Sequence, residues 1–195
     1  MIGEILVSIF SIDVLPILVS IGALLFAIGS FWWMHWRKGR LYVSPSRSYA
    51  AHGSEDGPLV LKLPLVLFNS GALPIVVQNL RVHISQNSSS ATLNFIATSP
   101  SLSNNEGREL AVQFPVLGRK AVSNYFEFQR RPGRFVFSEG AYRIRIEALL
   151  DRKQRWRKLV EFDLFVSSRS ISSINSRLIV HDNSLGENNE FDFGS

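Results

Sequence analysis

The stretch AYRIRIEALLDRKQRWRKLVEFDLFVS, residues 141–167, has the sequence pattern of a β-hairpin. In residues 141–150 apolar and charged side chains alternate strictly, which is typical of a strand with one buried and one wet face. Residues 151–154 predict the turn and residues 155–167 the returning strand. We expect the inward side chains of that returning strand to be Trp156, Val160, Phe162, Leu164 and Val166.

The charged residues of this hairpin also predict its register. A three-residue loop at 152–154 places Arg145 opposite Glu161, and Arg143 opposite Asp163, on the solvent face. Opposite-charge pairs across two strands stabilise a sheet by about 0.2–1 kcal/mol each and disfavour a slipped register.

Working outward, the rest of the chain after residue 40 also predicts strands. A short first strand and a loop are expected within 41–57, and further strands over 59–68, 73–85, 91–98, 109–116, 124–128 and 134–137. Residues 178–180 could add an edge strand. Pro64 cannot donate a ladder hydrogen bond, so we expect a bulge or an open edge there. Seven or eight short strands separated by turns favour an antiparallel β-sandwich over residues 58–167.

Two segments carry a resemblance to a known fold. The stretch LFNSGALPIVVQNLRVHI, residues 67–84, resembles the paired early strands of bacterial immunoglobulin-like modules, including the CARDB type, and SEGAYRIRIEALL, residues 138–150, resembles their penultimate strand. The resemblance implies an immunoglobulin-like sandwich that binds partners or acts as a spacer. It also makes Tyr142 a candidate corner tyrosine, whose hydroxyl returns to the preceding backbone. The chain has no cysteine, so the Cys…Trp…Cys spacing is missing.

The N-terminal part of the chain predicts a membrane anchor. Residues 14–34, VLPILVSIGALLFAIGSFWWM, carry no charged side chain, and a transmembrane helix over 14–36 is long enough to cross a bilayer. A cleavable signal peptide would begin with basic residues and have a shorter apolar core. A buried core helix would keep a polar stripe. Residues 1–13 contain Glu4 and Asp13 but no basic residue, and we expect them to be a short extracytoplasmic N-terminus.

The end of this span predicts both the membrane interface and the orientation. The candidate interface residues are Trp32, Trp33, Trp36, Arg37, Lys38 and Arg40. Basic residues follow the span and none precedes it, which favours an N-terminus outside and a cytoplasmic C-terminal domain joined by a basic segment and linker at 37–57. The alternative is an extracytoplasmic domain, where sandwich modules are common. Ala23 and Ala27 have a small-xxx-small spacing that would allow homo-oligomers through the helix.

Charge gives the remaining lead on partners. Residues 41–178 hold 18 Lys and Arg against 10 Asp and Glu. The candidate basic interaction face consists of Arg130, Arg131, Arg134, Arg152, Lys153, Arg155, Arg157 and Lys158. A protein partner or anionic lipid suits such a face, whereas nucleic acid is disfavoured because exposed interleaved aromatics are missing. Residues 168–195 form a polar tail, disordered over its last 15 residues, with Phe191 and Phe193 as a candidate partner motif.

No sequence motif predicts catalysis, a cofactor or a metal. The four histidines share no ligand spacing, and no HExxH, GxGxxG, GxxxxGK[ST] or GxSxG motif is present. His83 is interpreted as a solvated residue on a wet strand face. We therefore expect a non-enzymatic, membrane-anchored interaction or scaffolding module. The alternatives are an extracytoplasmic ligand-binding or envelope-spacer domain, and a hydrolase whose pocket holds His83 or His52 beside a carboxylate.

Overall fold

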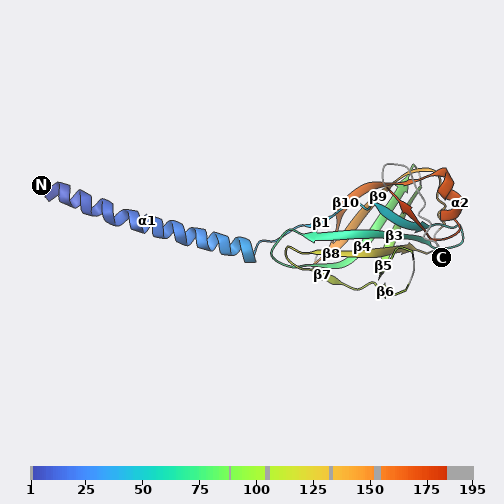
Figure 1. The fold of residues 1–195 in the computed structure, drawn as a ribbon, viewed down its shortest axis with the longest axis horizontal. Helices are drawn as coiled ribbons and strands as arrows, with labels where there is room; N and C mark the ends of the chain where they lie inside the picture. Colours follow the sequence, from blue (N-terminus) through green and yellow to red (C-terminus); the bar gives the residue numbers. More distant parts are fainter. Residues whose placement is uncertain (1, 88, 104–105, 132–133, 152–154, 184–195) are drawn as a thin grey trace.

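The N-terminal helix projects from a β-sheet body (Figure 1). The computed structural model describes residues 2–87, 89–103, 106–131, 134–151 and 155–183, with side chains from residue 14 onward. Helix α1 spans Ile2–His35 and is therefore longer than the predicted span. Pro16 lies in the helix interior, where the Ser20 hydroxyl donates to its carbonyl at 2.7 Å. The mainly β fold with one N-terminal apolar helix is confirmed.

The β body contains eleven described strands and two short helical turns. The strands are β1 (Leu41–Val43), β2 (Ser48–His52), β3 (Leu59–Asn69), β4 (Ile75–Gln86), β5 (Ser89–Ser99), β6 (Glu109–Leu110), β7 (Phe114–Val116), β8 (Ala121–Arg130), β9 (Gly140–Leu150), β10 (Trp156–Val166) and β11 (Ile179–Asp182). The helical turns are η1 (Ser168–Ser170) and α2 (Ile171–Ile174).

All the strands belong to one antiparallel sheet. Its main order is β10-β9-β4-β5-β8-β3-β2-β11, while β1 pairs with β3, β6 with β5 and β7 with β4. The hydrogen-bonded ladder is thus continuous, and a two-sheet sandwich stays a prediction. At Pro64, one edge of β3 pairs with β8. Along its other edge β2 pairs before Pro64 and β1 pairs after it, and neither reaches Pro64, which matches the expected open edge.

Polar contacts join the two ends of this sheet. The Tyr49 hydroxyl on β2 donates to the carbonyl of Phe165 on β10 at 2.6 Å. Asn183, just after β11, accepts from the Phe165 N–H at 3.0 Å and donates to the Asp163 carbonyl at 2.9 Å. The sheet therefore curls around one core, which the inward leucines of β3 share with Phe126, Phe128, Tyr142, Ile144 and Ile146.

The β9–β10 hairpin has the predicted register with one departure. Arg145 lies opposite Glu161 and Arg143 opposite Asp163, with closest ion-pair distances of 3.5 and 3.6 Å. A β-bulge at Leu159 inserts one residue into β10. Before the bulge the side chains change faces, so the inward position expected for Trp156 is wrong. Its ring lies on the outer face, 4.3 Å from the Arg81 guanidinium.

Three segments before the hairpin differ from prediction. The expected loop after the first strand contains β2, whose central residues are buried against β3. The single strand expected over 109–116 is two short strands, β6 and β7, which pair with different neighbours. Residues 134–137 are not a strand, yet Phe135 and Phe137 are buried and their rings pack on Tyr142. Ring packing, not ladder pairing, holds this segment.

The polar tail also differs from prediction in its described part. Although the tail is polar in composition, Ser170 and Ile174 are buried. The predicted extra edge strand at 178–180 is confirmed as β11, which pairs with β2. It continues through His181 and Asp182, so disorder from residue 181 is wrong for these positions. Phe191 and Phe193 lie outside the described residues.

Candidate binding surfaces

The anchor helix joins the body through a closely bonded neck, which we define as residues 33–41 with the loops 69–74 and 117–120. The Arg37 guanidinium donates to the Ser70 carbonyl at 2.9 Å, and the Arg37 carbonyl accepts from the Ala72 N–H at 2.9 Å. From the other loop, the Arg119 guanidinium donates to the Trp33 carbonyl at 3.1 Å. The end of the helix is therefore held from two sides.

A buried asparagine ties the first neck loop to the end of β7. The Asn69 amide donates to the carbonyls of Leu73 and Val116 at 2.8 and 3.1 Å, and its oxygen accepts from the Gly71 N–H at 2.9 Å. Gly71 also packs against the backbone of Gly39, where neither position leaves room for a Cβ. Asn69 and Gly71 thus contribute directly to the attachment of the helix.

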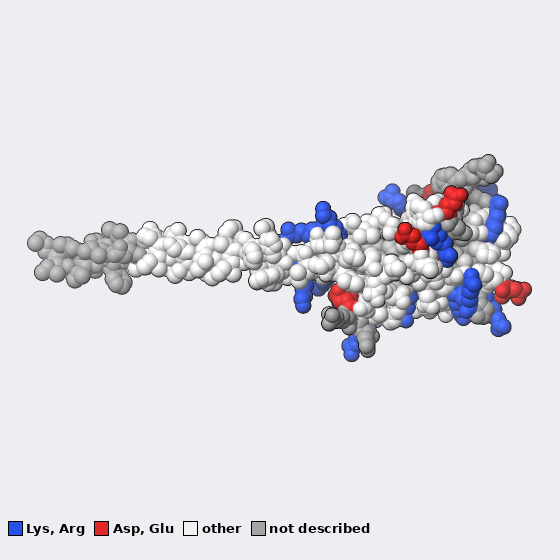
Figure 2. Space-filling view, turned by 90° about the horizontal axis from the view of Figure 1, so that it is seen from below, with Lys and Arg blue, Asp and Glu red and all other residues white. Residues whose placement is uncertain are grey.

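Five of the six predicted membrane-interface residues lie in this neck, and Trp32 directly precedes it. Trp32, Trp33 and Trp36 are exposed, and the Arg37 guanidinium lies 4.1 Å from the Trp33 ring. Lys38 and Arg40 are exposed, as are Arg119 and Lys120 on the adjoining loop. Figure 2 shows lysine and arginine side chains on both sides of the junction between helix and body. The neck thus combines exposed indole rings with positively charged side chains.

A hollow of about 560 Å³ opens beside the neck; we call it the neck hollow. Lys38 and Arg40 line it from the chain leaving the helix, and Arg157 and Lys158 line it from β10. Its apolar wall consists of Leu41, Leu73, Pro74, Ile75, Leu150 and Leu159. Asp151 also lines it, and its carboxylate accepts from the Val76 N–H at 3.1 Å. Four cations and one carboxylate therefore surround a partly apolar hollow.

The structure divides the predicted basic interaction face. Arg157 and Lys158 belong to the neck hollow, whereas Arg130 lines a second hollow on another part of the sheet. Arg131, Arg134 and Arg155 are exposed, and Arg152 and Lys153 lie outside the described residues. Arg130 ends β8, which β9, β4 and β5 separate from β10 in the sheet order.

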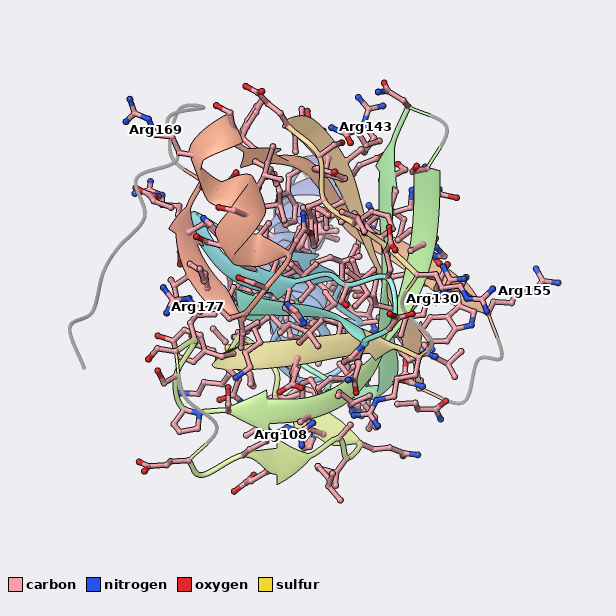
Figure 3. The ribbon with its side chains drawn as sticks, turned by 90° about the vertical axis from the view of Figure 1, so that its right-hand side faces the viewer. Arg108, Arg130, Arg143, Arg155, Arg169 and Arg177 are labelled. Atoms are coloured by element: carbon pink, nitrogen blue, oxygen red, sulfur yellow. The ribbon has the colours of Figure 1, made fainter. Side chains whose placement is uncertain are left out.

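The second hollow, of about 480 Å³, is lined by residues of β4, β5, β9 and β10 and by Arg130 at the end of β8; we call it the sheet hollow. Its charged lining residues are Arg130, Arg143, Arg145 and Glu161, together with His83. Glu161 also pairs with Lys158, and its pKa is lowered mainly by the hydrogen bond from that lysine. Figure 3 shows Arg130 and Arg143 on one side of the body, away from Arg169 and Arg177.

His83 has two side-chain partners at this hollow and is not simply solvated. Its Nδ1 lies 2.8 Å from the Thr92 hydroxyl, and its Nε2 lies 3.1 Å from the Glu147 carboxylate. Arg81 approaches the same carboxylate oxygen at 2.6 Å. Burial alone would raise the pKa of Glu147, but the hydrogen bonds from Arg81 and His83 leave it lowered. A hydroxyl, an imidazole and a carboxylate thus form a chain.

Sequence reasoning missed a buried charged cluster between β3 and β8. The Lys62 side chain is 1% exposed and its Nζ lies 3.9 Å from the Glu127 carboxylate. Arg108 binds that carboxylate with two hydrogen bonds of 3.0 and 3.1 Å. Burial lowers the pKa of Lys62. The negative charge of Glu127 acts to raise this pKa, and the positive charge of Arg108 acts to lower it. Lys62 is the one charged residue in the apolar run 59–68, and it was the sequence feature that could have indicated this cluster.

A second buried group that sequence reasoning missed is His181 on β11. It is fully buried and stacks on Tyr49 with ring centroids 5.1 Å apart. Neither ring nitrogen has a hydrogen-bond partner among the described residues. Burial lowers its pKa to about 4.

The described residues hold no group of three or more His, Cys, Asp or Glu that could bind a metal ion.

No family model and no curated protein matches this chain. Among solved structures, a protein from Archaeoglobus fulgidus is 12% identical, with a TM-score of 0.36, covering 66% of this chain and 96% of its own. A Bordetella pertussis protein described as ApaA is 12% identical, with a TM-score of 0.39, covering 68% of this chain and 98% of its own. Scores this low carry no argument about function.

Proposed function

We propose that this chain is a single-pass membrane protein that presents its β body as a non-enzymatic, protein-binding module at the cytoplasmic face. The observation that carries the proposal is the surface of α1. Residues Val14–His35 are long and apolar enough to span a membrane, and none of that window is buried against the body. An isolated helix of this kind is stable when lipid, not water, surrounds its side chains.

The orientation rests on flanking charge. Arg37, Lys38, Arg40 and Arg47 follow the span, and residues 1–13 contain no Lys or Arg. Such asymmetry favours retention of the basic side in the cytoplasm. The finer fold proposed is an immunoglobulin-like module, supported by the corner contact of Tyr142, whose hydroxyl accepts from the Ser138 N–H at 2.7 Å and donates to the Ser138 carbonyl at 3.2 Å.

The proposed partner is an acidic protein segment that binds at the sheet hollow. Three arginines and one glutamate line this hollow. Arg143 and Arg145 already have carboxylate partners, while Arg130 makes no ion pair with a described residue. Guanidinium groups match carboxylates in geometry and bind them with two parallel hydrogen bonds. A carboxylate-rich segment would therefore find Arg130 without an ion-pair partner among the described residues, beside two further arginines.

Attachment and orientation are tested on the full chain in cells. The chain should stay with membranes after alkaline washing, and its mass should include residues 1–36. A reporter fused after Ser195 should be active in the cytoplasm. Release of a chain shortened at the N-terminus would show that the helix is a signal sequence. Activity of the reporter only outside the cytoplasm would support the extracytoplasmic spacer instead.

Partner binding is tested by titrating a fluorescent ten-residue polyglutamate peptide into the detergent-solubilised full chain. Substituting Arg130→Gln and Arg143→Gln should weaken binding at least tenfold, because hydrogen bonds to charged groups contribute about 1.5–3 kcal/mol each. The matched control is Arg169→Gln with Arg177→Gln, which removes two exposed arginines elsewhere. Equal affinity in both double variants would contradict the assignment of the sheet hollow.

A hydrolase is the second candidate, and the Thr92–His83–Glu147 chain favours it. In a catalytic triad the imidazole takes the proton of the hydroxyl, and the carboxylate orients the imidazole ring. Against catalysis, Arg81 shares the Glu147 oxygen that His83 contacts. A fluorophosphonate probe that labels the native chain but not the Thr92→Ala and His83→Gln variants would establish the hydrolase. No labelling of the native chain leaves the binding module as the proposal.

A further inference from the structure

We infer that the neck hollow is a binding site for the headgroup of an anionic phospholipid. This inference rests on the proposed membrane attachment and deepens it, because it assigns a lipid class to a defined group of residues. The ligand is a phosphodiester carrying net negative charge, with its glycerol and first acyl carbons attached.

The position of the hollow is the first support. The apolar window ends at His35, and the hollow begins at Lys38, three residues further along the chain. At 1.5 Å rise per residue the 22-residue window spans about 33 Å, which matches a hydrocarbon core of roughly 30 Å. With Trp32, Trp33 and Trp36 at the interface, the hollow lies at the depth of the lipid headgroups.

The lining chemistry is the second support. The cations come from two separate parts of the chain, Lys38 and Arg40 beside the helix and Arg157 and Lys158 on β10. All four side chains are exposed, and Lys158 also pairs with Glu161. The apolar part of the lining, which includes Leu73 and Leu159, suits glycerol and acyl carbons. A soluble anion would use only the cations, whereas a phospholipid uses both walls.

The rigidity of the neck is the third support. Arg37 and Arg119 bond the helix end to the body, and Gly39 packs directly on Gly71. The backbone that carries Lys38 and Arg40 is therefore held against the body before any lipid arrives. Preorganisation of this kind reduces the entropy lost on binding.

The test measures which lipids the full-length chain retains. The purified chain is mixed with equal amounts of phosphatidylglycerol and phosphatidylcholine of matched acyl length in detergent, and bound lipids are counted by native mass spectrometry. The native chain should retain phosphatidylglycerol at least tenfold over phosphatidylcholine. Each basic residue near an anionic lipid contributes about 1 kcal/mol, so Arg157→Gln with Lys158→Gln should lower this preference roughly tenfold or more. Leu73→Asp, at an exposed loop position, should abolish it.

The control variant is Arg169→Gln with Arg177→Gln. It removes two exposed arginines beside η1 and α2, at the end of the body away from α1 (Figure 1). This control should keep the native preference. An equal loss in the control, an unchanged preference in the Arg157 and Lys158 variant, or no preference in the native chain would overturn the site.

A further arm adds glycerol phosphate as a soluble competitor. The lipid should stay bound at equal competitor concentration, and its displacement would show that a free phosphate suffices. None of these readouts depends on a protein partner or on the orientation of the chain. Release of the body from membranes in cells would instead contradict the proposed function while leaving the lipid measurement intact.

Discussion

Gly39 and Gly71 pack backbone to backbone: a Cβ on Gly39 would lie 2.1 Å from the Gly71 nitrogen, and one on Gly71 would lie 2.0 Å from the Gly39 nitrogen. Both residues belong to the neck, one in the chain leaving the helix and one in the loop after β3. A third glycine, Gly118, approaches Ala72 just as closely. The helix is therefore attached through contacts that only residues without a side chain can make.

Substituting Gly71→Ala should open the neck. The added methyl group meets backbone atoms that cannot rotate away, and overpacking of this kind costs about 1–3 kcal/mol. Thermal unfolding of the full chain in detergent should show a lower midpoint, and a protease should cut faster near residue 39. Gly22→Ala is the control, because nothing lies within 4 Å of a Cβ there. Equal stability of the two variants would contradict the packing.

Stability should fall in mild acid because of His181. Its pKa is lowered from 6.5 to about 4, so the folded protein favours the neutral ring while the unfolded chain binds the proton. This contribution is fully present above pH 6.5 and is lost as the pH falls toward 4, by up to about 3 kcal/mol. Urea unfolding at several pH values measures this slope.

The variant His181→Phe should remove that part of the slope. Phenylalanine keeps the ring stacked on Tyr49 and has no nitrogen to leave without a partner. His35→Gln, at the exposed end of α1, should leave the slope in place. A slope that persists unchanged in His181→Phe would show that another group causes the acid sensitivity.

Substituting Glu127→Gln should be strongly destabilising. It would leave the buried Lys62 charge without its carboxylate partner, and breaking a buried ion pair by removing one partner costs about 3–5 kcal/mol. Lys62→Met should cost much less, because Glu127 would keep its two hydrogen bonds from Arg108. Urea unfolding at pH 7 compares the two variants. A larger loss in Lys62→Met than in Glu127→Gln would refute this account.

Tyr142→Phe should cost about 1 kcal/mol of unfolding free energy. The variant loses the contact with the Ser138 N–H while the ring keeps its packing on Phe135 and Phe137. The Tyr42→Phe control changes a residue that is 53% exposed and should be neutral. Chemical unfolding of both variants under one condition decides whether the hydroxyl contributes.

Regular alternation made part of the fold predictable from sequence. The β9–β10 register follows from charges at fixed spacing, and β3 follows from its apolar run. The bulge at Leu159 left no such signal, because Lys-Leu-Val fits either register, and Trp156 was therefore placed on the wrong face. Ile174 was missed because its segment is polar and depends on contacts with distant strands to be buried.

The candidate surfaces were predictable only where neighbours in sequence are neighbours in space. The anchor and its basic flank lie within one continuous segment, so composition alone located them. The basic interaction face joined β8 and β10 residues that the sheet order keeps apart. Likewise, the Thr92–His83 pair arises from cross-strand register, and Glu147 reaches His83 from a third strand. Contacts of this kind depend on the order and register of the strands, which no short sequence motif in this chain predicts.

The bonded neck has a mechanical consequence. A flexible linker would let the body rotate independently of the helix. Here Arg37, just after the helix, donates to the Ser70 carbonyl of the body, and Arg119 of the loop 117–120 donates to the Trp33 carbonyl of the helix. Any turn of the helix about its own axis therefore becomes a turn of the whole sheet. If two helices paired through Ala23 and Ala27, their bodies would face each other at one set azimuth, and torque applied to either end would reach the other.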